Sequence, residues 1–327
     1  MKVGIIGAGR IATKMAKAIT NMEGVEKYAI ASRDIEKAKD FADRCQINQA
    51  YGSYKKLVED PDVDLVYIAT PHSHHYEHAM LAIEAGKPVL CEKAFTANAR
   101  EADSLLNLAH RKGVFITEAM ITRYLPLSQT IREVLDSGII GTPAILSATL
   151  SYSLAWKERV MRSSLCGGAL LDIGIYCIHF ARICFGTDIE KVTSACIRGG
   201  DDMVDMHESI SFIYRNGRLA NLQASALGMD DRRALISGEN GFLTIDNVNC
   251  PTKLTVWKDY EPIKEYSTED NQFTGLRYEV AACKDALKHG WIESPQMPHV
   301  ETLAIMKQMD ALRKEWGVIY PNDRIWK

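Results

Sequence analysis

The feature that most constrains the fold is a glycine pattern after the first apolar run of the chain. The segment Lys2–Ile6 is typical of a buried strand, and Gly7-Ala8-Gly9-Arg10-Ile11-Ala12 follows it directly. This spacing matches the G-x-G-x-x-G/A fingerprint, in which the glycines allow a tight turn and a close approach to a pyrophosphate. The following helix directs free backbone N–H groups at phosphates. The residues predicted to line a dinucleotide here are Gly7, Gly9, Arg10, Ile11 and Ala12.

Short apolar runs alternate with helical patterns up to about residue 120, which is typical of βαβ units and a parallel, doubly wound Rossmann sheet. The predicted strands are Lys2–Ile6, Lys27–Ser32, Leu65–Ala69, Pro88–Cys91 and Phe115–Glu118. The predicted helices are Ile11–Asn21, Ile35–Arg44, Ser53–Glu59, His74–Ala85 and Ala99–Lys112. This context favours a dinucleotide site over the alternative, a Gly-rich turn with only a structural role.

The pattern changes after Arg123, where strand-like runs dominate. Asn216-Gly217 and Asn240-Gly241 lie between such runs, and Asn-Gly favours tight hairpins, so the second sheet is expected to be mostly antiparallel. A long apolar helix is predicted over Gly168–Cys184, and two more helices close the chain. The predicted architecture is α/β, with one domain over residues 1–122 and a second over 123–327.

Composition narrows the possible partners and compartments. The 327 residues carry a formal net charge of -3 and no basic block, which argues against nucleic acid or an anionic membrane as partner. The eight cysteines form no Cys-x-x-Cys pair and are expected to be reduced and mostly buried. No apolar run approaches the roughly 20 residues of a membrane helix, and the first residues do not resemble a signal peptide. We therefore expect a cytoplasmic protein.

The end of the second predicted strand bears on the choice of dinucleotide. An NAD site usually places an acidic residue there to bind the ribose 2′-OH, whereas this chain has Ser32 and Arg33. A hydroxyl and a guanidinium suit a 2′-phosphate, so NADP(H) is favoured over NAD(H). Asp34 leaves two interpretations open, because it is either the acidic residue displaced by one position or the N-cap of the next helix.

Polar residues follow two further strands of the predicted parallel sheet, at the edge where ligands bind. Thr70-Pro71-His72 and His75 follow one strand, and Glu92-Lys93 ends the next. The residues predicted to line the cofactor loops are therefore Thr70, Pro71, His72, His75, Glu92 and Lys93. A metal site is the alternative for the histidines, but no third ligand is suitably placed, so no metal is expected.

The apolar helix predicted over Gly168–Cys184 carries three polar residues on one face. Asp172, Tyr176 and His179 follow i, i+4, i+7 spacing. Ionisable groups on a buried stripe are costly unless they are paired or functional, so both a catalytic cluster and a polar knot in the core remain open.

Together these segments resemble the Gfo/Idh/MocA family of oxidoreductases over essentially the whole length. The resemblance rests on Gly7–Ala12, the Thr70-Pro71 loop with His75, Glu92-Lys93 and Gly167–Tyr176. Its narrower match is to the branch of dimeric dihydrodiol dehydrogenases and NADP-linked D-xylose dehydrogenases. The stretches that carry this narrower match are Glu118–Arg123, Tyr124–Pro126 and Glu293–Pro295. The chain departs from the family's Glu-Lys-Pro motif at Ala94 and has Tyr176 where most members have histidine, a change that the branch shares.

The resemblance implies a substrate-binding and oligomerisation domain after the Rossmann domain, an active site between them, and a homodimer or homotetramer formed through the second sheet. It implies Lys93, Asp172 and Tyr176 as catalytic residues. In our hypothesis Tyr176 exchanges a proton with the substrate oxygen while a hydride moves to or from nicotinamide. Lys93 favours the tyrosinate and stabilises an oxyanion, and Asp172 orients the lysine or a substrate hydroxyl. Weaker candidates for the substrate pocket are Arg123, Trp156, Arg159 and His179.

The predicted function is NAD(P)-dependent transfer of a hydride between nicotinamide and a small carbonyl or hydroxyl substrate of the sugar, dihydrodiol or dicarbonyl type. One alternative is an NAD-dependent polyol or sugar dehydrogenase of the same fold. The other is a dinucleotide-sensing regulator without turnover, against which the retention of Lys93, Asp172 and Tyr176 argues.

Overall fold

The computed structural model describes residues 1–200 and 202–324, and the chain forms two compact units. Unit 1 contains Met1–Met120, Gln272–Lys307 and the residues from Asn322 on, and unit 2 contains Ile121–Asn271 and Gln308–Pro321. The predicted change near residue 122 is therefore present. The expectation of one continuous second domain over 123–327 needs correction, because the chain returns to unit 1 after the second sheet.

The sheet of unit 1 has the strand order β3-β2-β1-β4-β5-β6, and every pair of neighbours is parallel. The strands are β1 (Lys2–Ile6), β2 (Glu26–Ala31), β3 (Gln49–Tyr51), β4 (Leu65–Ile68), β5 (Val89–Glu92) and β6 (Ile116–Ala119). The order reverses between β1 and β4, and ligands of open α/β sheets bind where the strands end at such a point. The predicted Rossmann sheet is confirmed. Only β3 was missed, because three residues are too short for a periodic signal.

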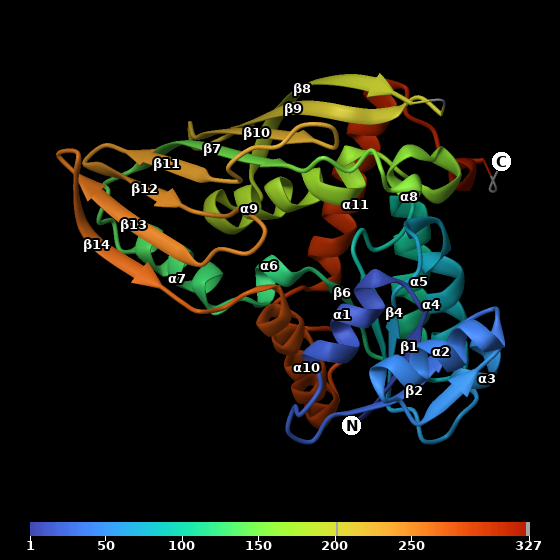
Figure 1. Ribbon diagram of the computed structural model, residues 1–327. Helices are drawn as coiled ribbons and strands as arrows, with labels where there is room; N and C mark the ends of the chain where they lie inside the picture. Colours follow the sequence, from blue (N-terminus) through green and yellow to red (C-terminus); the bar gives the residue numbers. More distant parts are fainter. Residues whose placement is uncertain (201, 325–327) are drawn as a thin grey trace. The chain divides into compact units, whose positions relative to one another are not determined.

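Helices cover this sheet, and the last of them comes from far along the sequence (Figure 1). They are α1 (Arg10–Ala18), α2 (Ile35–Cys45), α3 (Tyr54–Val58), the 3-10 turn η1 (His72–His74), α4 (His75–Glu84), α5 (Ala99–Lys112) and α10 (Gln272–His289). Leu276 and Val280 of α10 share a buried core with Met15 of α1 and with Ile19, the C-cap of that helix. Burial of this apolar face is the physical reason that α10 joins unit 1.

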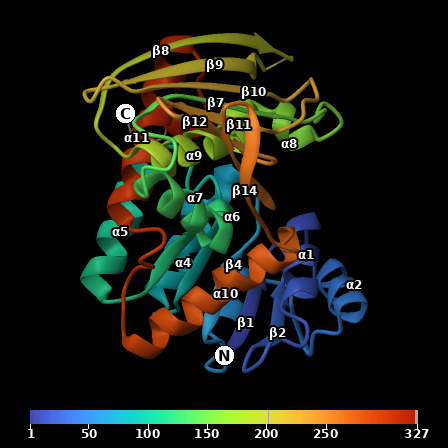
Figure 2. The same cartoon turned by 90° about the vertical axis from the view of Figure 1, so that its left-hand side faces the viewer.

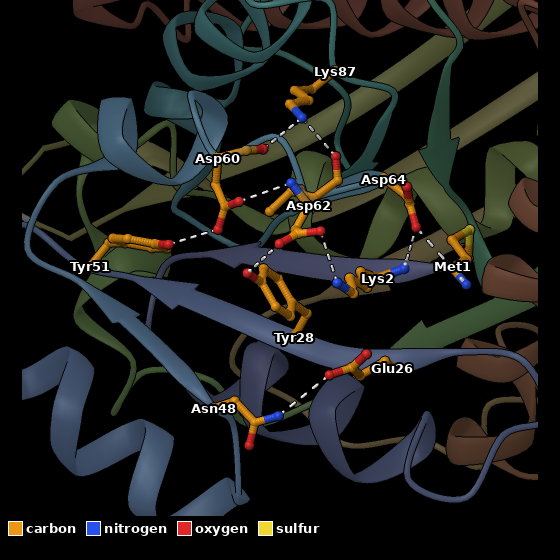
Figure 3. Close-up of polar contacts among 11 residues, drawn as sticks. Met1, Lys2, Glu26, Tyr28, Asn48, Tyr51, Asp60, Asp62, Asp64 and Lys87 are labelled. Carbon is orange, nitrogen blue, oxygen red and sulfur yellow. Dashed lines mark hydrogen bonds and ion pairs between the residues drawn. The ribbon is translucent and has the colours of Figure 1, made fainter.

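A polar network lies at the N-terminal ends of the strands, where β1 and β4 begin (Figure 3). Asp64 accepts a hydrogen bond from the backbone N–H of Lys2 at 2.6 Å, and the Lys2 ammonium lies 2.9 Å from Asp62. The Lys87 ammonium donates to the carbonyl oxygens of Asp60 and Val63 at 2.7 and 2.9 Å. These contacts hold the turn that leads into β4. Ligands of such sheets bind at the other, C-terminal ends of the strands.

Unit 2 is built on a sheet of strand order β14-β13-β12-β11-β7-β10-β9-β8, which is antiparallel except where β7 pairs with β10. The strands are β7 (Pro143–Ser151), β8 (Ile189–Gly199), β9 (Val204–Tyr214), β10 (Leu219–Ser225), β11 (Ala234–Gly238), β12 (Gly241–Ile245), β13 (Lys253–Lys258) and β14 (Glu261–Ser267). The mostly antiparallel sheet is as predicted, with Asn216-Gly217 between β9 and β10. β14 was missed because it is exposed almost throughout and shows no apolar alternation.

Helices α7 (Pro126–Asp136) and α9 (Ile175–Phe185) lie on one side of the second sheet, as Figure 1 and Figure 2 show. The remaining helical segments are α6 (Ile121–Tyr124), α8 (Glu158–Met161), η2 (Ser163–Leu165), the π-helical turn η3 (Leu170–Gly174), α11 (His299–Trp316) and η4 (Pro321–Asp323). Ser163–Phe185 is 23 residues long with a mean hydropathy of 1.5, so by length and composition it could cross a membrane, contrary to our expectation. Its most apolar part is 83% buried inside the protein, as in a core helix.

Candidate cofactor-binding and catalytic residues

The glycine loop between β1 and α1 has the backbone that a pyrophosphate site requires. Gly7 has a φ of 100°, and a Cβ there would lie 2.8 Å from the carbonyl oxygen of Ala69. Gly9 is the N-cap of α1 and provides no side chain to cap it. Ala12 is completely buried, which matches the small third position of the fingerprint. The start of α1 therefore offers backbone N–H groups and a helix dipole to an anion, and the residues present fit a dinucleotide.

The residues after β2 resolve one ambiguity of the sequence. Asp34 is the N-cap of α2, and its Oδ1 accepts hydrogen bonds from the backbone N–H groups of Glu36 at 2.9 Å and Lys37 at 3.4 Å. The carboxylate is therefore engaged in capping its own helix. Ser32 is buried, whereas Arg33 is exposed at the end of the strand. Ser32 and Arg33 are thus the side chains available where an NAD site usually has its acidic residue.

His75 connects the loops that follow β4 and β5. Its ring is fully buried, with Nε2 2.8 Å from the carbonyl oxygen of Thr70 and Nδ1 2.8 Å from that of Ala94. Burial lowers the pKa of His75 to about 4, so the ring is neutral at pH 7 and has a single N–H to donate. These contacts give His75 the role of shaping both loops, and its predicted contact with the cofactor stays a prediction.

Thr70 and Pro71 are half-buried at the start of the same loop, and His72 is buried in η1. The Thr70 hydroxyl lies 3.0 Å from Nδ1 of His78, whose pKa burial lowers to about 3. The rings of His75 and His78 are therefore both uncharged at pH 7. Within residues 1–200 and 202–324, no group of three or more histidine, cysteine, aspartate or glutamate residues could hold a metal ion.

Lys93 follows β5 on a loop that is held from both sides. Lys93 is half-buried, and the peptide bond between Lys93 and Ala94 is cis. His75 contacts the carbonyl oxygen of Ala94, and the backbone N–H of Phe95 donates to Oε1 of Glu118 at 3.0 Å. The loop therefore has fixed partners although Ala94 replaces the family's proline.

Glu92 lies beneath this loop in a buried acidic cluster that sequence reasoning missed. It accepts a hydrogen bond from the hydroxyl of Tyr67 on β4. Burial and the charge of Glu92 raise the pKa of Glu279 on α10 well above its usual range. Glu92 at the end of β5 and Glu279 on α10 are separated by 186 residues in the sequence. No local sequence pattern therefore predicts that the two side chains lie close together, and only the fold brings them together.

In unit 2 the predicted polar face of Asp172, Tyr176 and His179 does not form one cluster, because Asp172 and His179 have different partners. Asp172 is buried and forms an ion pair with Arg159, whose Nη2 lies 2.7 Å from Oδ1. His179 is fully buried, and its Nδ1 accepts a hydrogen bond from Nε of Arg123 at 2.8 Å. Burial and the charge of Arg123 lower the pKa of His179 well below its usual value. Tyr176 is the half-buried residue between them.

The stripe differs from a simple helix face because Asp172 lies in the π-helical turn η3, whereas Tyr176 lies in α9. A π-helical turn adds a residue to the turn and changes the direction of the side chains before it. Trp156 is 63% exposed, and its Nε1 donates to the carbonyl oxygen of Ser153 at 3.1 Å, so it is not part of this buried group. The catalytic and substrate assignments stay predictions.

Sequence profiles describe both parts of the chain. Residues 1–120 match a Gfo/Idh/MocA profile described as an oxidoreductase family with an NAD-binding Rossmann fold. Residues 128–244 match the Gfo/Idh/MocA C-terminal domain. Trans-1,2-dihydrobenzene-1,2-diol dehydrogenase of Mus musculus is 33% identical over 332 residues, with 99% of each chain covered, and that of Homo sapiens is 32% identical with the same coverage.

Solved structures agree with these matches. KijD10, a 3-ketoreductase from Actinomadura kijaniata in complex with NADP, is 26% identical with a TM-score of 0.84, over 96% of this chain and 97% of that one. Aldose-aldose oxidoreductase from Caulobacter crescentus has the same TM-score at 20% identity over 96% of each chain, which shows the shared fold.

Proposed function

The chain belongs to the Gfo/Idh/MocA family of NAD(P)-dependent oxidoreductases, and from that premise we propose that it uses NADP(H) to interconvert a small vicinal hydroxyl compound and its carbonyl form. The relatives named above support this substrate class, since they are a dihydrodiol dehydrogenase and a 3-ketoreductase. Suitable probes are trans-1,2-dihydrobenzene-1,2-diol and D-xylose with NADP⁺, and kcat below refers to the better of the two.

The observation that carries the choice of NADP(H) is the N-cap at Asp34. Since this carboxylate binds the backbone of α2, the ribose end of the site is left to Ser32 and Arg33. A guanidinium forms charge-assisted hydrogen bonds with a phosphate and has none of the acceptor oxygens that a ribose 2′-OH would use. NADP in the complex of the KijD10 ketoreductase supports the same choice.

Arg33→Gln is expected to weaken NADP⁺ binding by about 10- to 100-fold, which corresponds to the loss of roughly 1.5–3 kcal/mol from one charged hydrogen bond. The affinity for NAD⁺ should change much less, because NAD⁺ has no 2′-phosphate. Calorimetric titration with both dinucleotides measures this. Arg44→Gln is the matched control, since Arg44 is an exposed residue of α2 that pairs with Asp40. Tighter binding of NAD⁺ than of NADP⁺ to the wild-type protein would contradict the proposal.

Once bound, NADP(H) supplies or accepts the hydride. We assign the accompanying proton to the Tyr176 hydroxyl, which donates it to the substrate oxygen in reduction and accepts it in oxidation. Lys93 is assigned as the cation that stabilises negative charge on that oxygen. Asp172, paired with Arg159, is assigned to the hydroxyl next to the reacting carbon, because a carboxylate accepts and a guanidinium donates hydrogen bonds.

We further propose that the chain assembles as a homodimer or homotetramer through the open face of its second sheet. Ile145, Ile197 and Leu235 are 44%, 64% and 40% exposed, and the residues that alternate with them are buried on β7 and β11 and half-buried on β8. Exposed apolar side chains gathered on one sheet face are typical of an interface. Light scattering should give a multiple of the chain mass, and Leu235→Glu should reduce it to the monomer. Ile319→Glu should not, because Ile319 is equally apolar and 55% exposed but lies between α11 and η4, outside the sheet. A monomeric wild-type protein would exclude this assembly.

We also propose that the protein is located in the cytoplasm. All eight cysteines are free thiols, and seven of them are buried, as expected for a reducing environment. Fractionation of cells expressing the tagged full chain would test it, and recovery in a membrane or secreted fraction would contradict it.

A further inference from the structure

Strand β9 carries two buried carboxyl groups that play no part in the reaction proposed above. Asp205 is fully buried, and Glu208 is 5% exposed. Glu208 follows the same alternation as Ile210, Phe212 and Tyr214, which face the core of unit 2. Among the residues that the structure describes, neither carboxyl oxygen of Glu208 has a hydrogen-bond partner. A buried carboxyl without such a partner is costly, so its retention calls for a physical reason.

Each carboxyl contacts one end of the π-helical turn η3. Oδ2 of Asp205 accepts a hydrogen bond from the backbone N–H of Leu170 at 2.6 Å, at the start of the turn. At its end, a Cβ added to Gly174 would overlap Oε1 of Glu208, so this oxygen lies directly against the backbone there. Asp172 lies inside the turn, and Tyr176 follows it by two residues.

A β-bulge brings the two carboxyl groups to the same element. In a regular strand, residues three apart point to opposite faces. Between β8 and β9, however, Ile197 pairs with His207 and Arg198 pairs with Asp205, which leaves Met206 as an extra residue. This bulge changes the direction of Asp205, so that both Asp205 and Glu208 contact η3. β-Bulges and π-helical turns both occur frequently at functional sites.

Burial raises the pKa of both carboxyl groups. Burial raises the pKa of Asp205 to about 6, while backbone N–H groups and Arg313 lower it. Burial and the neighbouring Asp205 raise the pKa of Glu208 well above its usual range. Among the described residues the Glu208 carboxyl has no hydrogen-bond partner, and it lies against the backbone of η3 at Gly174. Asp205 accepts a hydrogen bond at one end of the turn, and Glu208 packs against the backbone at the other.

We propose that Asp205 and Glu208 act as positioning residues, which hold both ends of η3 and thereby fix the directions of Asp172 and Tyr176 for catalysis. This inference rests on the proposed roles of Asp172 and Tyr176. It assigns Glu208 a packing function against the backbone of η3, and it explains why residue 174 is glycine, because a side chain there would displace the carboxyl group.

Glu208→Leu introduces a side chain of similar size but removes the planar carboxyl group that packs against Gly174, and it is expected to lower kcat at least tenfold. The dissociation constant of NADP⁺ should stay within twofold of wild type, because the glycine loop belongs to unit 1. Glu208→Gln should keep most of the wild-type kcat, since its planar amide has nearly the shape of the carboxyl group. Tyr214→Phe is the matched control, because it removes a buried hydroxyl without a described partner from the same face of β9.

Gly174 provides a second test that does not depend on the folding of the Leu variant. Gly174→Ala should lower kcat, and adding Glu208→Ala should raise it again because the methyl group then has room. Wild-type kcat in a folded Glu208→Leu variant, or no recovery in the double variant, would overturn the inference. If Tyr176→Phe is inactive while Glu208→Leu is fully active, the proposed function stands and the positioning role fails. If Tyr176→Phe is active, both fail.

Discussion

Tyr176→Phe is expected to lower kcat by about 10²- to 10⁴-fold, the contribution typical of a positioned acid or base. The substitution removes one hydroxyl and keeps the ring, which is half-buried at the beginning of α9. The NADP⁺ affinity and the unfolding temperature should stay close to wild type, because the cofactor loop lies in the other unit and the apolar contacts of the ring remain. Steady-state kinetics, calorimetry and thermal unfolding on the same preparations measure the three quantities.

Tyr266→Phe is the matched control, because Tyr266 lies on the edge strand β14 of the same unit. Near-wild-type kcat in Tyr176→Phe would remove Tyr176 from the acid–base role. An equal fall in both variants would point to a general effect of losing a tyrosine hydroxyl.

Lys93→Met is expected to lower kcat by about 10²- to 10³-fold, because loss of one preorganised group that stabilises an oxyanion has effects of this size. Methionine has a similar length and no charge, so the change tests the cation and leaves most of the packing. Rates measured in reduction and in oxidation should fall together, since the same oxygen carries the charge in both directions. In Lys93→Ala, where the shorter side chain leaves room for it, added ethylamine, a small soluble cation, should restore part of the rate if the missing charge is the cause.

Lys87→Met is the control for Lys93→Met, because the two lysines flank β5 at opposite edges of the same sheet. Lys87 donates to the carbonyl oxygens of Asp60 and Val63, so its loss should lower the free energy of unfolding by about 1–3 kcal/mol. Its kcat should remain unchanged. If Lys93→Met loses stability and keeps its kcat, Lys93 is a structural residue and the assignment is wrong.

Sequence reasoning succeeded where the signal is local. The glycine loop and the strands of the Rossmann sheet follow from short-range periodicity and turn chemistry, and the structure confirms the parallel sheet. The Asn-Gly hairpin after β9 belongs to the same class. The contacts of Asp205 and Glu208 with η3 are only partly predictable from the sequence. Glu208 follows the alternation of the buried residues in its strand, whereas the bulge at Met206 breaks this alternation before Asp205.

The sequence by itself determined the dinucleotide-binding unit, because its glycine spacing and βα rhythm act over a few residues at a time. It also determined which residue types were available for catalysis. Only the tertiary structure decided that Asp34 caps α2, that Asp172 pairs with Arg159, and that α10 returns to unit 1. Each of these outcomes depends on which groups remain unsatisfied once the chain is packed. Burial makes an unpaired charge or an exposed apolar face costly, and the partners that relieve this cost are supplied by the fold.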